Sequence, residues 1–399
     1  MVEFTEKDAI DRLVEVVIQR SSEAIISNEI CFLRNDESGT GIFAKSKISA
    51  DSVLVRVPFK ECISLESVVA SPLHEIIDTR PGLLDYQDEV IALGLMYAAT
   101  AGQHVKSDAT PTCPWIFHLK TIPTSYNTPI YWLESELNEL KGCNVYHLSN
   151  LMKKQITKDW EELHKPLSEE YPHLLGGATI ELYQWALSTV YSRAVGFQRN
   201  GKYTRCIPPI IDLANHNPDA AVETADTLFY DENNDTLSLL NNKEKSIGDE
   251  CCAVYGTYPN SKLLYSYGFI LPNCPTKAVD LWTRVTPSIS NANVKQEILQ
   301  SYELTKSQNY DFDGTIRPGY VSPALLATIR VIQAEGNEEM ENIQKAFIGE
   351  MVSVRNEKAA YTSLRNLLLQ SMRLEVAAVS DVIIYFSQFC LFCMIQHNI

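Results

Sequence analysis

The sequence is short of positive charge. It holds 34 lysine and arginine residues against 50 aspartate and glutamate residues, a formal net charge of -16 over 399 residues. Nucleic acids and anionic membrane surfaces attract proteins chiefly through lysine and arginine. We therefore expect neither nucleic acid nor membrane as the main partner, and the acidic balance leaves room for a basic protein or peptide.

The start of the chain lacks the apolar core of a secretory signal, since residues 1–9 are Met-Val-Glu-Phe-Thr-Glu-Lys-Asp-Ala. This acidic stretch also does not suit a mitochondrial or chloroplast transit peptide. The ten cysteines are scattered along the chain, which favours reduced thiols inside the cell. The expected location is the cytoplasm or the nucleus, and the sequence does not choose between them.

Long apolar runs, internal repeats and low-complexity tracts are also missing. The most apolar stretch is residues 382–395, which is too short for a membrane span to be assigned with any weight. Three interpretations of this stretch remain open: a packed final helix, a translated intron sequence, or, ranked last, a tail anchor.

The composition is that of a globular protein, with 45% hydrophobic and 21% charged residues. A chain of this length is expected to form two or three domains, each with its own core. Apolar periodicity predicts a helix, then short strands, then a helical block from about residue 64, and a helix-rich remainder after residue 287. The helix is predicted over residues 6–20 and the strands over residues 29–33, 41–44 and 53–58.

Two polar clusters stand out in the middle of the chain. Asp212, Asn215 and His216 follow an apolar run that Pro208 and Pro209 keep from being a central strand or a helix interior. The second cluster begins at Tyr255, which ends another apolar run. Residues 226–254 between them are predicted to form strands separated by turns. This hairpin-like segment would let the two clusters meet in space.

These clusters resemble the SET-domain protein methyltransferases. The features that carry the resemblance are Asn215-His216 after a proline-bearing run, Tyr255-Gly-Thr257, and Tyr267-Gly-Phe269. Their order is similar to the RuBisCO large-subunit methyltransferase type, which includes the actin-histidine methyltransferases. The match extends to Ser38-Gly-Thr-Gly-Ile-Phe-Ala44 and to Ser192-Arg193, and it covers the chain up to about residue 370.

The resemblance implies an α+β fold. A β-rich SET domain over residues 20–275 would be split by a helical insertion at about 61–185. A C-terminal helical domain, the Rubisco LSMT substrate-binding domain of this family, would follow at 285–375. Residues 376–399 depart from the family as an atypical apolar tail.

The implied activity is methylation of a nitrogen in a protein side chain, with S-adenosylmethionine as the methyl donor. The first expectation is a protein-lysine N-methyltransferase that acts on a non-histone protein, and a protein-histidine N-methyltransferase is the alternative. A third hypothesis is a catalytically silent SET scaffold that binds a protein through its C-terminal helices. The partner is an unidentified protein substrate, and we expect a monomer.

The resemblance also assigns residues to the donor site. The turn Ser38, Gly39, Thr40 and Gly41 would present backbone groups to the donor, and Asn215, the backbone of His216 and Tyr267 would complete the site. Arg193 is a candidate for the donor's carboxylate or for the substrate channel, where Asp212 and Tyr255 also belong. Two positions depart from the family: Ser38 stands where glutamate is frequent, and Thr189 stands where the plant-enzyme branch has a second arginine.

Tyr255 is the expected catalytic residue. Methyl transfer from a sulfonium needs in-line approach by a neutral lone pair, so the site must align two reactants. A phenol oxygen with backbone carbonyls around it stabilises positive charge and orients the nucleophile. The plainer interpretation makes Tyr255 a core aromatic at a strand end.

No metal is expected. Asp212 and His216 are four positions apart and would share one face of a helix, but Pro218 limits any helix there and no further ligands stand at metal spacing. A metallohydrolase therefore ranks behind both the methyltransferase and the silent scaffold. His216 alone would more often be a hydrogen-bonded structural histidine, and Asp212 a cap of the turn before Asn215. Cys390 and Cys393 are interpreted as buried thiols.

Overall fold

The computed structural model describes residues 6–35, 38–102, 113, 115–141, 143–221, 226–276, 278–281, 283, 285–286, 288–301, 315–317 and 319–378. The chain divides into two compact units. The first combines residues 1–126 with 153–257, and the second combines 127–152 with 258–399. The apolar run at 382–395 lies outside the described residues, and the domain limits expected from the sequence stay a prediction.

The first unit contains the strands that the sequence predicts near its start and between the two polar clusters. One antiparallel sheet has the order β1-β4-β9-β8, a second has the order β5-β7-β6, and β2 forms a hairpin with β3. The strands are β1 (Ile25–Ile26), β2 (Ile30–Asn35), β3 (Gly39–Ala44), β4 (Ser52–Pro58), β5 (Ile63–Ser64), β6 (Val195–Arg199), β7 (Lys202–Ile207), β8 (Leu228–Asp231) and β9 (Thr236–Asn241).

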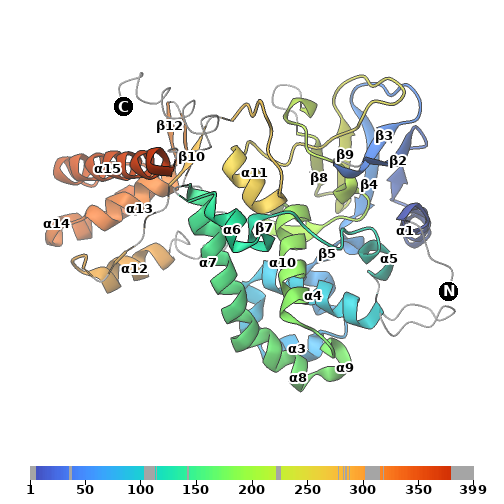
Figure 1. The fold of residues 1–399 in the computed structure, drawn as a ribbon, viewed down its shortest axis with the longest axis horizontal. Helices are drawn as coiled ribbons and strands as arrows, with labels where there is room; N and C mark the ends of the chain where they lie inside the picture. The colour runs from blue at the N-terminus through green and yellow to red at the C-terminus, as the bar shows by residue number, and fades with distance from the viewer. Residues whose placement is uncertain are drawn as a thin grey trace. The chain divides into compact units, whose positions relative to one another are not determined.

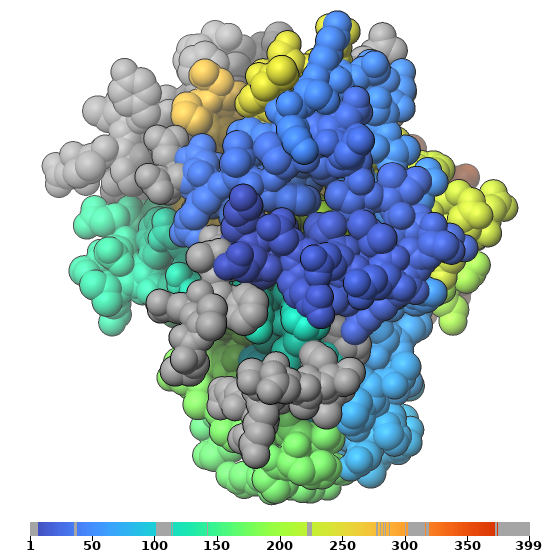
Figure 2. Space-filling view, turned by 90° about the vertical axis from the view of Figure 1, so that its right-hand side faces the viewer, coloured from blue at the N-terminus to red at the C-terminus, as the bar shows by residue number. Residues whose placement is uncertain are grey.

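The core of this unit lies between these sheets and the N-terminal helix. Val55 and Val57 of β4 are fully buried, as are Ile42 of β3 and Leu239 of β9. The helix α1 (Glu6–Arg20) adds Ile10, among other apolar residues, to the same core, as its periodicity predicted. Figure 2 shows α1 and the β2–β3 hairpin, in blue, on one face of the unit.

A helical block runs between β5 and β6, where an insertion was expected. Two long helices of this block, α4 and α10, pack on each other, and α4 is buried and apolar nearly all round. In Figure 1, α3, α8 and α9 lie at the end of this unit away from β2, β3 and β4. The helices are α2 (Leu65–Val69), α3 (His74–Thr79), α4 (Gln87–Gly102), α5 (Ile116–Leu119), α7 (Asn144–Asp159), α8 (Lys165–Glu170), α9 (Pro172–Leu175) and α10 (Ile180–Arg193), with one π-helical turn at Trp160–His164.

The second unit is mostly helical. A small antiparallel sheet of order β10-β11-β12 accompanies its helices, and the long final helix packs on α13. The elements are α6 (Glu134–Asn138), α11 (Asn260–Tyr267), β10 (Val279–Asp280), α12 (Ala292–Ser301), β11 (Thr315–Arg317), β12 (Tyr320–Val321), α13 (Pro323–Gln333), α14 (Gly336–Glu341) and α15 (Val354–Ala378).

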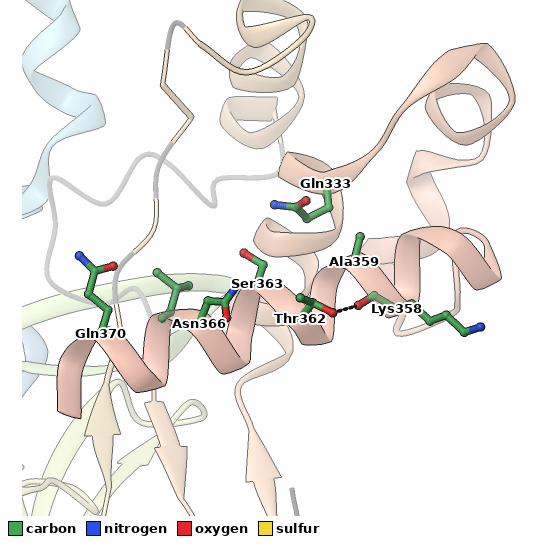
Figure 3. A pocket seen from close by; sticks show the side chains of 8 residues that line it. Gln333, Lys358, Ala359, Thr362, Ser363, Asn366 and Gln370 are labelled. Carbon is green, nitrogen blue, oxygen red and sulfur yellow. Dashed lines mark hydrogen bonds between the residues drawn. The ribbon is translucent and has the colours of Figure 1, made fainter. Parts of the chain in front are cut away.

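A groove of about 430 Å³ runs along α15 in the second unit. Amide and hydroxyl side chains line it, and Figure 3 shows Gln333 of α13 facing Ser363 and Ala359 across it. Thr362 donates its hydroxyl back to the Lys358 carbonyl at 2.7 Å, so this side chain is held against its own helix. Over the described residues, no helix combines the length and apolarity needed to cross a bilayer.

Candidate functional site

Three segments that are distant in the sequence lie side by side in the first unit. The segment 249–253 is hydrogen-bonded to β3 through Cys251 N to Ile42 O at 2.7 Å and Ala44 N to Asp249 O at 2.8 Å. On its other side it pairs in parallel with residues 215–217, where Ala253 N donates to Asn215 O at 2.8 Å. The prediction that the two polar clusters meet in space is confirmed.

Gly41 of β3 faces Asn215. A β-carbon added at Gly41 would lie 2.9 Å from Nδ2 of Asn215 and 2.5 Å from Oε1 of Glu250, so only glycine fits here without a shift. The same amide nitrogen of Asn215 donates to Oε1 of Glu250 at 2.7 Å. Backbone, amide and carboxylate groups thus converge around Gly41, which has no side chain. We call this space, lined by Asn215 and Glu250, the cradle. Its polar groups suit the amino-acid end of a small ligand.

His216 holds the backbone of Tyr255. The amide N–H of Tyr255 donates to Nδ1 of His216 at 3.1 Å, and the two rings lie 5.1 Å apart with a tilt of 31°. Because Nδ1 accepts a hydrogen bond here, it carries no proton, and the imidazole is neutral in this arrangement. Burial also lowers the pKa of His216. The His216 ring is thus hydrogen-bonded, as expected of a structural histidine.

The phenol of Tyr255 is fixed by a backbone carbonyl. Its hydroxyl donates to the main-chain oxygen of Ala214 at 2.9 Å. Burial raises the pKa of Tyr255 to about 12, and the Arg193 charge only partly opposes this. The side chain therefore stays a neutral phenol at physiological pH and is not available as a general base.

Asp212 and Arg193 form a buried ion pair beside Tyr255. Arg193 Nη1 donates to the Asp212 carbonyl at 2.8 Å and to its Oδ2 at 3.1 Å, and Oδ2 also lies 3.2 Å from Nε2 of His118. Burial by itself would raise the pKa of Asp212, but His118 and Arg193 outweigh it and keep this pKa below its usual range. The carboxylate thus contacts side chains of both α10 and α5. The interpretation of Asp212 as a turn cap is wrong, because its carboxylate bonds to these helices and not to the turn before Asn215.

Backbone strain precedes this cluster. Ile210 has φ +69° and ψ -44° and is fully buried, and Ile211 N donates to Pro209 O at 2.8 Å across it. This is a γ-turn with positive φ, which a β-branched residue rarely adopts. Such strain is retained where the surrounding structure fixes a functional segment. Here it turns the chain directly from β7 into Asp212.

The remaining predicted residues are Ser38, Gly39, Thr40 and Tyr267. Ser38 is exposed, and Gly39 and Thr40 pair with Asn35 and Arg34 near the tip of the β2–β3 hairpin. Tyr267 ends α11 in the second unit, where its ring stacks on Tyr258 at 6.2 Å. The structure therefore brings together Gly41, Arg193, Asp212, Asn215, His216 and Tyr255 within one unit.

Two residues of the site were missed from the sequence. His118 sits in the helical block, far along the chain from Asp212, and no local pattern links the two. Glu250 lies within residues 226–254, which were predicted only as strands and turns. Its position just before the apolar run that ends at Tyr255 could have marked it as a site residue. Within the described ranges, no group of three or more histidine, cysteine, aspartate or glutamate side chains is arranged to hold a metal ion.

Comparison with known proteins supports the predicted relationship. Residues 286–373 match the family model described as Rubisco LSMT substrate-binding. The actin-histidine N-methyltransferase of Mus musculus is 26% identical over 315 residues, which cover 77% of this chain and 50% of that relative. The Homo sapiens protein of the same name is 25% identical, and the match again covers 77% of this chain and 50% of that relative. The chain thus spans about half the length of these curated relatives.

The fold is that of solved SET-domain structures. A crystal structure of the SET domain of LSMT bound to lysine and AdoHcy superposes with a TM-score of 0.64 at 20% identity, covering 92% of this chain and 81% of that one. A structure of Rubisco LSMT bound to AdoMet gives a TM-score of 0.62 at 20% identity, with the same coverage. The predicted α+β fold and the resemblance to the RuBisCO large-subunit methyltransferase type are confirmed.

Proposed function

We propose that this chain is an S-adenosylmethionine-dependent protein N-methyltransferase and that its acceptor is a histidine side chain. The observation that carries the proposal is the convergence of Gly41, Asn215 and Tyr255 in one unit. The cradle at Gly41, with an amide and a carboxylate beside it, suits the donor's amino-acid moiety. Relatives named for methyl transfer and structures that bind AdoMet or AdoHcy support the same assignment.

S-adenosylmethionine would supply a methyl group bonded to a positively charged sulfur. Asn215, Gly41 and the His216 backbone would hold the donor, and Tyr255 would face the reacting nitrogen. Because the Tyr255 hydroxyl donates a hydrogen bond to Ala214 O, the lone pairs of its oxygen are free to face developing positive charge. The Asp212–Arg193 pair would keep the turn that carries Asn215 in place. Catalysis would then rest on alignment, without a covalent enzyme intermediate.

The curated relatives named above are histidine methyltransferases, which supports histidine over the lysine expected first. The protonation states of the site support the same choice. Tyr255 is held as a phenol, His216 Nδ1 accepts the hydrogen bond of the Tyr255 amide, and Asp212 is paired with Arg193. A histidine side chain is largely neutral above its ordinary pKa of about 6.5, whereas a lysine near 10.4 must first lose a proton.

Lysine is the second candidate. The observation that favours it is the fold similarity, over 92% of this chain, to a structure described with lysine bound. The groove on α15 lies within the segment matched to the substrate-binding family, and we propose that this unit holds the protein substrate. The proposal includes a monomeric enzyme of the cytoplasm or nucleus, which light scattering and a fluorescent fusion would test.

Transfer of labelled methyl groups tests the proposal. The purified chain would be incubated with S-adenosylmethionine carrying a tritiated methyl group, together with actin or with lysate proteins from the source cells. The labelled products would be hydrolysed and their amino acids separated. We expect label in methylhistidine, and much less of it with the Tyr255→Phe variant. Label in methyllysine would overturn the histidine assignment in favour of lysine. A wild type that binds the donor but labels no protein would contradict the transferase.

A further inference from the structure

Glu250 stands at the centre of the proposed donor site. It lies on the segment that hydrogen-bonds β3 on one side and residues 215–217 on the other, and Phe43 is its bridge partner across to β3. Its Oε1 accepts the Asn215 Nδ2 hydrogen bond at 2.7 Å. The same oxygen lies 2.5 Å from where a β-carbon of Gly41 would be. The carboxylate therefore points into the cradle and not away from it.

The carboxylate of Glu250 is hydrogen-bonded to an amide and to a thiol. Among the described residues no lysine, arginine or histidine forms an ion pair with it. Lys245 Nζ donates to the main-chain oxygen of Glu250 at 2.7 Å, not to its side chain. The nearby Cys252 is a neutral thiol, because burial raises its pKa to about 12 with a contribution from Glu250. A half-buried anion with only neutral partners is costly, and a cationic ligand offsets that cost.

Asn215 is oriented by the same contact. Because its Nδ2 donates to Glu250, its carbonyl oxygen Oδ1 must point away from that carboxylate. Two acceptors of different segments, a carboxylate and an amide oxygen, are thereby arranged around the space beside Gly41. An ammonium group is the ligand that such a pair suits, since it has three donors and no acceptor.

We propose that Glu250 binds the α-ammonium group of the methyl donor, with the Asn215 amide as the second acceptor. This inference rests on the proposed function, because it names the group that the donor presents to this part of the site. In this role Glu250 increases the affinity of the site for the methyl donor. Glu250 contributes nothing specific to the sulfonium, so the product S-adenosylhomocysteine, which keeps the ammonium, is bound through the same contact.

Calorimetric titration of three probes tests this assignment. S-adenosylmethionine and S-adenosylhomocysteine both carry the ammonium, whereas 5′-methylthioadenosine lacks the amino-acid portion. Each probe would be titrated into wild type and Glu250→Gln, whose side-chain oxygen still accepts the Asn215 hydrogen bond. Glu244→Gln is the matched control, because Glu244 is an exposed acid on the same stretch that pairs with Lys47 at 2.9 Å. Thermal unfolding without ligand checks that each variant folds.

We expect Glu250→Gln to weaken both ammonium-bearing probes by the same factor, roughly tenfold as for a charge-assisted hydrogen bond, and to leave 5′-methylthioadenosine unchanged. Glu244→Gln should match wild type for all three. Unchanged affinities in Glu250→Gln, weakening of S-adenosylmethionine alone, or equal weakening of all three probes would each overturn the assignment. A folded wild type that does not bind S-adenosylmethionine would contradict the proposed function itself, and this inference with it.

Discussion

The backbone N–H of Tyr255 donates to Nδ1 of His216 at 3.1 Å, so a side chain of one polar cluster fixes the main chain of the other. The parallel bridge between His216 and Ala253 places the two segments in register for this contact. The position of the Tyr255 phenol thus depends on a histidine that must be neutral, and this gives the site a predictable pH dependence.

Acid should loosen this contact. Burial lowers the pKa of His216 in the folded chain, so between that value and the ordinary value of about 6.5 the unfolded state binds more protons than the folded one. The stability that His216 contributes is therefore present above about pH 6.5 and is lost as pH falls through the folded pKa. Urea unfolding of wild type from pH 8 to pH 5 measures the loss.

The variant His216→Asn is the control for that series. Its side-chain oxygen takes the place of Nδ1 as an acceptor but does not titrate, so its stability should change less than that of wild type over the same range. His216→Ala should be less stable than wild type by about 1 kcal/mol at pH 8, because one acceptor is lost. A wild type and a His216→Asn with the same pH profile would refute this account.

Tyr255→Phe should separate binding from chemistry. It removes the hydroxyl that donates to Ala214 O at 2.9 Å and leaves that buried carbonyl unpaired, at about 1–2 kcal/mol of stability. We expect donor affinity to remain within a few-fold and kcat to fall by roughly 10²–10³, as for loss of one oriented polar group in a reaction site. Steady-state kinetics beside calorimetry checks both, and an unchanged kcat would count against a catalytic Tyr255.

Gly41→Ala should block the donor cradle. The added β-carbon would lie 2.5 Å from Glu250 Oε1 and 2.9 Å from Asn215 Nδ2, and both side chains would have to move. Donor affinity should fall at least about tenfold, with a stability cost of about 1–3 kcal/mol. Gly82→Ala is the matched control, because nothing lies within 4 Å of its added β-carbon. Equal donor affinities in the two variants would place the cradle elsewhere.

Asp212→Asn should cost more stability than any surface acid. Its side chain is fully buried, and the substitution removes the charge that pairs with Arg193. Breaking such a buried pair costs about 3–5 kcal/mol. Because its folded pKa is depressed, wild type should lose this contribution only as pH falls below about 4. Denaturant unfolding measures it, and exposed Asp11→Asn should differ little from wild type.

Much of the site was predictable because its residues lie at the ends of strands that the sequence marks clearly. Alternating apolar residues and turn clusters between residues 226 and 254 indicated a hairpin, and a hairpin returns Tyr255 to the neighbourhood of Asn215. The helix over residues 6–20 followed from its apolar spacing and is confirmed as α1. Local pattern was enough wherever partners were joined by one short connection.

The rest depended on tertiary packing. His118 meets Asp212 only because the helical block folds back on the strands, and no spacing in the sequence encodes that contact. Ile210 adopts positive φ although a β-branched residue disfavours it, so the packing around it overrides its local preference. From the sequence, Glu250 is predicted only to lie in a turn, whereas in the structure its carboxylate accepts a hydrogen bond from Asn215. These are the positions where surrounding structure, and not propensity, decides.

The most direct test of the central claim is calorimetric titration of S-adenosylmethionine into the folded wild type, Tyr255→Phe and Asn215→Ala. The account predicts binding by wild type, binding retained in Tyr255→Phe, and binding lost in Asn215→Ala, whose amide links the cradle to Glu250. Absence of binding by a well-folded wild type would contradict the enzyme and leave a SET-shaped module that binds proteins. Binding that persists unchanged in Asn215→Ala would contradict the site as described.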